Sequence, residues 1–169
     1  MAKRTFNDSA RKALPSSGSA RTAAFTLLGR RDYTSAELST RLIDRGYPAE
    51  DVADAIKTLI ADGIVNDARV AAAHVRTSTR VKGRGRLRVK GELMARGLSR
   101  QAIDEALSAV DTVDEREALV RILKRKKYPD RPTMAERQRM YQHLMRRGFA
   151  GDLIRSVLGR GSWTSDDDA

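Results

Sequence analysis

Most of the side chains that could do chemistry in this chain are arginine and lysine, and they gather in one stretch. Between Arg76 and Arg100 the sequence holds nine basic residues and a single acid, Glu92, giving a net charge of +8. Like charges at this density repel one another, so the run favours a surface that faces an anionic partner over one that is only solvated. It includes Lys82-Gly83-Arg84-Gly85-Arg86, whose glycines lack side-chain bulk and would let a phosphate or acidic surface come close.

A second basic cluster begins at Lys124-Arg125-Lys126-Lys127 and continues with Arg137, Arg139, Arg146 and Arg147. The first four of these residues are expected to end a helix, where the helix dipole stabilises cations, so a structural role explains them equally well. The residues expected to form a partner-binding or DNA-binding basic face are Arg76, Arg80, Lys82, Arg84, Arg86, Arg88, Lys90, Lys124, Arg125, Lys127 and Arg146.

Patterns typical of catalysis are absent from the sequence. There is no cysteine, and the two histidines, His74 and His143, have no carboxylate at ligand spacing. The Gly-Arg segment lacks the spacing of a phosphate-binding P-loop, and no nucleophile-elbow, kinase-like or zinc-protease motif occurs. We therefore expect a protein that is not an enzyme, with no catalytic residue, no metal site and no cofactor. Tyr33, Tyr128 and Tyr141 are expected near helix ends or on exposed faces, where they could stack on a base.

Three copies of one six-residue sequence motif are expected to mark the helices that carry these side chains. Leu42-Ile43-Asp44-Arg45-Gly46-Tyr47 recurs in similar form around Gly97 and Gly148, and successive glycines are 51 positions apart. Apolar residues flank each glycine at steps of three and four, which predicts helices on both sides. Glycine suits the left-handed end of a helix, and the apolar residue after it can pack back on that helix. The S/T-x-x-E boxes at Thr34 and Thr133 predict the starts of helices that end at Gly46 and Gly148.

The sequence therefore predicts an all-α fold of three tandem three-helix repeats that form an elongated, curved array. We place the repeats at 20–65, 66–112 and 113–159, between a flexible basic tail (1–19) and a flexible acidic tail (160–169). The helices are expected at 20–30, 34–45, 49–61, 67–80, 85–96, 100–109, 114–127, 133–147 and 151–159. Arg84 and Arg88 are expected on the side of one helix that faces away from Val89 and Leu93.

Charge differs between the three copies. The net charge is +11 overall, yet residues 20–70 carry −1, whereas 71–121 carry +4 and 122–169 carry +5. This asymmetry favours an anionic partner on the later repeats. No run approaches the roughly 18 apolar residues of a membrane span. We expect a cytoplasmic protein, monomeric and without a membrane partner.

The chain resembles the RecX family of bacterial regulators of the recombinase RecA. The resemblance rests on Asp62-Gly63-Ile64-Val65-Asn66-Asp67-Ala68-Arg69-Val70-Ala71, Lys82-Gly83-Arg84-Gly85, Glu92-Leu93-Met94-Ala95-Arg96-Gly97 and Leu144-Met145-Arg146-Arg147-Gly148-Phe149. It covers about residues 20–159. One departure is Val70, where family members usually have an aromatic residue; valine keeps the apolar character of the position.

The resemblance implies a modulator that lodges in the groove of the RecA–DNA filament and inhibits ATP hydrolysis, strand exchange and filament growth. The basic stretch from Arg76 to Lys90 would supply electrostatic attachment, and contact with single-stranded or double-stranded DNA is expected to be weak and non-specific. Two alternatives remain open at this point. One is a DNA-binding helical module that acts without RecA, and the other is an enzyme that acts on nucleic acid.

Overall fold

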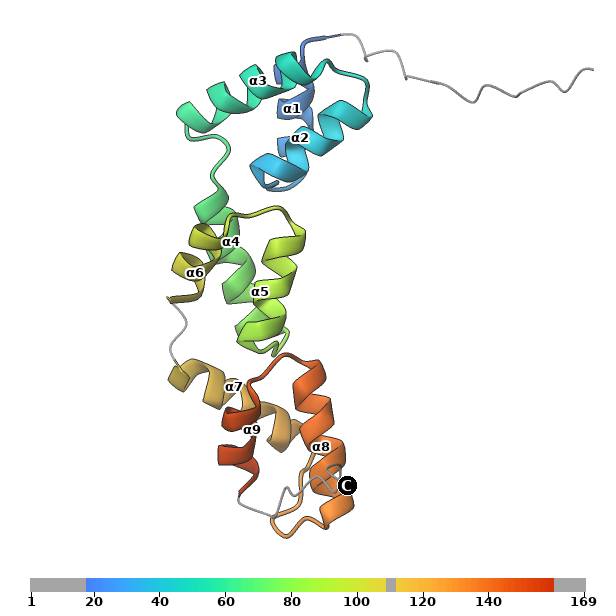
Figure 1. The fold of residues 1–169 in the computed structure, drawn as a ribbon, viewed down its shortest axis with the longest axis vertical. Coiled ribbons are helices and arrows are strands. Elements are labelled where there is room, and N and C mark those ends of the chain that lie inside the picture. Colours follow the sequence, from blue (N-terminus) through green and yellow to red (C-terminus); the bar gives the residue numbers. More distant parts are fainter. Residues whose placement is uncertain (1–17, 109–111, 160–169) are drawn as a thin grey trace, which may run out of the picture. The chain divides into compact units, whose positions relative to one another are not determined.

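The structure, a computed structural model, describes residues 18–108 and 112–159, except for the side chains of 112–114. Within these ranges every regular element is helical, as predicted (Figure 1). The elements are α1 (Ala20–Leu28), α2 (Ser35–Asp44), α3 (Ala49–Ala61), α4 (Asp67–Arg76), η1 (Thr77–Val81), α5 (Arg86–Ala95), α6 (Arg100–Ser108), α7 (Thr112–Arg125), α8 (Met134–Arg146) and α9 (Gly151–Leu158). The predicted tails, up to residue 17 and from residue 160, lie outside the described residues.

The chain divides after Asn66 into two compact units. Unit 1 contains α1–α3, which we call repeat 1. Unit 2 contains repeat 2 (α4–α6, with η1) and repeat 3 (α7–α9). Repeats 2 and 3 each bury a hydrophobic cluster of their own, so each repeat is one three-helix folding element within the larger unit.

Unit 1 is built on the apolar stripes that the sequence predicts. Leu38 and Leu42 of α2 and Leu59 of α3 are fully buried, and both α1 and α2 pack on α3. The predicted capping box begins α2: the N–H of Glu37 donates to Thr34 Oγ1 at 3.1 Å, and the N–H of Thr34 donates to the Glu37 carboxylate at 3.1 Å.

The expectation that Tyr33 is available for base stacking is wrong. Its side chain is only 6% exposed, and the guanidinium groups of Arg31 and Arg41 lie 4.0 and 5.3 Å from its ring centroid. The ring belongs to the core of unit 1 and is covered by cations that stack on its face. Packing in the core of unit 1, rather than contact with nucleic acid, therefore explains why an aromatic residue stands at this position.

The glycine turns have the expected geometry in every repeat. Gly46, Gly97 and Gly148 have φ of +88°, +78° and +84°, in the left-handed region that glycine adopts without strain. The residue after each glycine returns to the core and donates its N–H, at 3.3 Å, to a carbonyl five residues earlier. These buried residues are Tyr47, Leu98 and Phe149. The shared six-residue motif therefore ends a helix in each repeat, as the sequence predicts.

The helix predicted over 67–80 differs from the structure. Its α-helical part ends at Arg76, and a π-helical turn continues from Thr77 to Val81. Hydroxyl side chains in this turn compete for backbone carbonyls: Thr79 Oγ1 donates to the Val75 carbonyl at 2.9 Å. Ser78 and Thr79 are buried while Arg80 is exposed, so the wide turn presents this arginine to solvent.

Candidate functional site

The basic run of unit 2 borders a joint between repeats 2 and 3. The N-terminus of α5 meets the glycine turn between α8 and α9. Gly85 N–H donates to the Arg147 carbonyl at 2.8 Å, and Leu87 N–H donates to the Gly148 carbonyl at 3.0 Å. Arg86 N–H donates to a carboxylate oxygen of the buried Glu115 at 2.8 Å. Three of the N–H groups at the start of α5 are therefore satisfied within the protein.

This joint gives the Gly-Arg loop a role that differs from the expected phosphate approach. A Cβ atom on Gly85 would collide with the backbone of Gly148, and a Cβ atom on Gly148 would collide with the backbone of Arg88. The two glycines let two backbones come together. The missing side-chain bulk at Gly85 thus serves packing between repeats.

Arginine side chains fasten the same joint. Arg147 Nη1 donates to the carbonyls of Lys82 and Gly83 at 3.0 and 3.1 Å. Arg88 Nη1 donates to the Arg146 carbonyl at 3.1 Å. Within repeat 2, Arg86 Nη1 donates to the Leu107 carbonyl at 2.9 Å, and Lys90 Nζ pairs with Asp104 at 2.9 Å. Arg147 was not among the eleven residues expected to form the basic face.

Glu92, the single acid of the run, is the centre of a charged cluster. Arg84 and Arg88 both bind its Oε1, the latter at 3.1 Å, and His74 Nε2 lies 3.0 Å from its Oε2. Burial raises the pKa of Glu92, but hydrogen bonds from Arg84, His74 and Arg88 outweigh burial and hold the pKa below its usual value. Arg84 precedes α5 instead of lying within the helix, and it reaches Glu92 from the loop.

Replacing Glu92 with Gln is expected to lower the free energy of unfolding at neutral pH by about 1–3 kcal/mol, because partly buried cations lose their charged acceptor. Since the pKa of Glu92 is lowered on folding, its contribution is present above about pH 4.5 and disappears as the pH falls through the lowered value. Urea unfolding at several pH values measures this. Glu117→Gln, which removes only an exposed pair with Arg121, is the control. An equal loss for Glu92→Gln at acidic and neutral pH would contradict the account.

The eleven basic residues singled out from the sequence thus fall into two groups. Arg84, Arg86, Arg88 and Lys90 make the internal contacts given above, and their part in partner binding stays a prediction. The other seven are exposed, and within 18–108 and 112–159 their side chains have no acidic partner; they are Arg76, Arg80, Lys82, Lys124, Arg125, Lys127 and Arg146. We call these seven the free cations. Spacing could have marked Arg88, which stands four residues before Glu92 in α5, but it does not mark Arg86 or Lys90.

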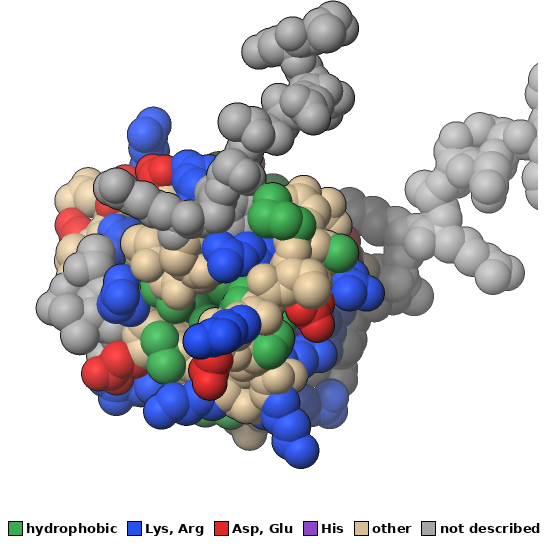
Figure 2. Space-filling view, turned by 90° about the horizontal axis from the view of Figure 1, so that it is seen from below, with side chains coloured by type: hydrophobic (Ala, Val, Ile, Leu, Met, Phe, Trp, Pro, Cys, Tyr) green, Lys and Arg blue, Asp and Glu red, His purple; other side chains and the backbone are tan. Residues whose placement is uncertain are grey.

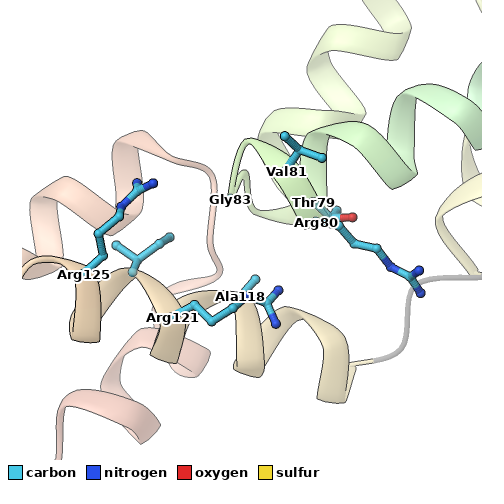
Figure 3. Close-up of a pocket in the computed structure, with 8 residues that line it drawn as sticks. Thr79, Arg80, Val81, Gly83, Ala118, Arg121 and Arg125 are labelled. Atoms are coloured by element: carbon cyan, nitrogen blue, oxygen red, sulfur yellow. The ribbon is translucent and has the colours of Figure 1, made fainter.

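Two hollows in unit 2 are lined by free cations. The first, of about 220 Å³, lies between η1 with its following loop and α7. Figure 3 shows Arg80 on one side of it and Arg121 and Arg125 on α7. Ala118 and Ile122 supply its apolar floor. Arg121 was not among the residues expected to form the basic face, because it lines the hollow only through the packing of α7 beside η1.

The second hollow, of about 470 Å³, lies in repeat 3 and we call it the repeat 3 hollow. Lys126, Lys127 and Tyr128 after α7 line one side, and Arg139 and Arg146 of α8 line another. Figure 2 shows one face of the molecule, on which Lys and Arg side chains surround smaller hydrophobic areas. Both hollows could hold an anion beside apolar contacts.

The described residues give no support for a metal site or for a membrane-spanning helix. No group of three or more His, Asp or Glu side chains there could hold a metal ion. No helix there is long and apolar enough to cross a bilayer. The surface of unit 2 is suited to binding an anionic partner by charge.

All-helical three-helix repeats place the chain among the proteins built of tandem helical repeats. Three family models match the chain: the first three-helix domain of RecX over residues 20–59, the second over 66–107 and the third over 114–158. The chain belongs to the RecX family of regulatory proteins.

Relatives and solved structures agree with this assignment. The regulatory protein RecX of Chromohalobacter salexigens is 35% identical over 80% of this chain and 88% of its own length. That of Acidithiobacillus ferrooxidans is 36% identical over 82% and 87%. The match spans only 55% of the longer Levilactobacillus brevis protein, with 30% identity over 86% of this chain. The crystal structure of RecX from Lactobacillus salivarius superposes with a TM-score of 0.76 at 21% identity, over 82% of this chain and 92% of that one, and it supports the fold.

The family departure at Val70 is accommodated. Val70 is 4% exposed in α4, so an apolar side chain of smaller volume fills a buried place there.

Proposed function

We propose that this protein binds the RecA–DNA filament and lowers its ATP hydrolysis, strand exchange and growth. Membership of the RecX family supports the regulatory role. The observation that carries the proposal is the set of free cations in unit 2, which have no acidic partner in the described structure. A surface of this kind attaches to an acidic groove or to neighbouring phosphates.

The joint between repeats 2 and 3 supports the mode of inhibition. Backbone hydrogen bonds and close glycine contacts hold the two repeats as one body. Such a body can contact neighbouring protomers of a filament and resist their rearrangement. Inhibition would follow from bridging, with no chemical step on the inhibitor.

Salt dependence tests the electrostatic part of the proposal. Binding of the full chain to RecA assembled on a labelled oligonucleotide is expected to weaken about tenfold or more between about 0.05 and about 0.3 M salt, because salt screens the free cations. Fluorescence anisotropy and co-sedimentation measure it. The same titration without RecA is the control. Tight, sequence-selective binding to DNA alone would instead support a stand-alone DNA-binding module and overturn the proposal.

A further inference from the structure

The repeat 3 hollow has the size and lining of a small-ligand site. Its volume of about 470 Å³ falls within the usual range for ligand pockets. Residues of α8 that line it, among them Arg139, Met140, His143 and Arg146, recur at steps of three and four. One face of α8 is therefore turned toward the hollow, opposite Tyr128 in the segment after α7.

The charge of this hollow is strongly positive. Lys126, Lys127, Arg139 and Arg146 line it, and the acid among its lining residues is Glu136. The Glu136 carboxylate is already held by the start of α8, where it accepts the N–H and the hydroxyl of Thr133, both at 2.8 Å. These backbone and hydroxyl hydrogen bonds lower the pKa of Glu136, so the carboxylate is committed to the cap. Arg139 Nε donates to the Ala135 carbonyl at 3.2 Å, and its charge also lowers the pKa of Glu136. Lys126, Lys127 and Arg146 face the hollow and form no ion pair with any residue of 18–108 and 112–159.

The pKa of His143 is lowered by burial and by the same positive charges. Arg147 Nε donates to its Nε2 at 3.1 Å, so this ring nitrogen accepts a hydrogen bond. Burial lowers the pKa of His143 first, and the charges of Arg147, Lys126, Arg146 and others lower it further. Neighbouring cations that disfavour one more positive charge would favour an anion.

Lys127 occupies a backbone position that is suited to glycine. Its φ is +51°, and it is the one residue other than glycine with positive φ in the described ranges. It ends α7 in a turn where Tyr128 N–H donates to the Leu123 carbonyl at 3.0 Å. Glycine would form this turn without the strain that a left-handed conformation imposes on other residues. The ammonium group at the rim of the hollow offers a functional reason for keeping lysine there.

From these contacts we propose that the repeat 3 hollow is a nucleotide-binding site. Lys127 and Arg146 hold the phosphate, while the half-buried Tyr128 and Met140 pack against the base. A free nucleotide and one unit of single-stranded nucleic acid share this chemistry. The site belongs to the isolated protein and does not require RecA.

The test titrates the full chain, labelled for amide NMR and without RecA, with inorganic phosphate, dTMP and a short oligothymidylate. Both thymidine probes are expected to shift the amides of Lys127 and Tyr128, and inorganic phosphate, which has no base, to bind more weakly. Lys127→Gln and Lys127→Gly are each expected to weaken thymidine binding about five- to tenfold, because a charge-assisted contact is lost. Lys57→Gln, an equal change of charge at an exposed position of α3, should leave the affinity within about twofold.

Measurements of unfolding distinguish a binding role of Lys127 from a role in folding. Lys127→Gly relieves the strained turn, so its urea midpoint should equal or exceed that of the parent although its binding is weakened. Much tighter binding of the oligonucleotide than of dTMP would identify single-stranded nucleic acid as the ligand of the site, and comparable affinity would identify the free nucleotide as the ligand. The proposal is overturned if no probe shifts these amides, or if Lys127→Gln binds as tightly as the parent. Because RecA is absent, either failure leaves the proposed function untouched.

Discussion

Replacing Gly85 with Ala is expected to lower the free energy of unfolding of unit 2 by about 2–5 kcal/mol. Gly85 has φ of −75° and ψ of 161°, so alanine fits its backbone conformation. The loss arises because the new methyl group would overlap the backbone of Gly148 and Phe149. Moving the turn away breaks the hydrogen bonds from Gly85 and Leu87.

Gly91→Ala is the matched control on the same helix. A Cβ atom at Gly91 meets nothing within 4 Å, and alanine favours helix, so this change should stabilise by about 0.5–1 kcal/mol. Urea unfolding followed by amide NMR signals of unit 2 compares the variants, and hydrogen exchange at Leu87 reports the joint itself. Unchanged stability together with unchanged protection at Leu87 in Gly85→Ala would show that the repeats are not joined in this way.

Reversing two free cations together, Arg80→Glu with Arg125→Glu, is expected to raise the concentration needed for half-maximal inhibition of RecA about tenfold or more. Both residues line the hollow between η1 and α7 (Figure 3), and both are exposed. Each reversal removes an attraction and adds a repulsion toward an acidic partner. Because neither side chain has an acidic partner in the described ranges, stability should change by only about 0.5 kcal/mol.

The control for this variant carries the same change of charge in unit 1. Arg30→Glu with Lys57→Glu reverses two exposed cations of repeat 1, the repeat that is close to neutral. ATPase inhibition assays on both double variants separate a local effect from one of net charge. Equal losses would show that total charge alone governs binding. Reversal of Arg84 and Arg88 would be a poorer test, since two new carboxylates would face Glu92 and disturb the fold.

Features that depend on neighbouring residues were predictable from the sequence. The Thr34 and Thr133 capping boxes and the turn glycines involve partners only a few residues away, and the structure has them as predicted. The joint was not predictable, because Gly85 and Gly148 lie far apart in the sequence and meet through backbone atoms that carry no side-chain signal. The pairing of Arg88 with Glu92 was within reach, since the two residues stand four apart in one helix, whereas Arg84 reaches the same carboxylate from the loop before α5.

The strained turn at Lys127 shows another limit. Its cluster of four basic residues was expected to end a helix, and α7 does end at Arg125. The sequence pattern alone did not show that a lysine stands in the left-handed position, where the other described turns of positive φ have glycine. Backbone geometry thus distinguishes one cation of a cluster whose members look equivalent in the sequence.

The DNA-dependent ATPase of RecA, measured while the full chain is titrated in at low salt, tests the central claim most directly. We expect a progressive, saturable fall in ATP hydrolysis that added salt relieves, because the attachment depends on the free cations. Full ATPase activity at saturating concentrations of the protein in low salt would contradict it.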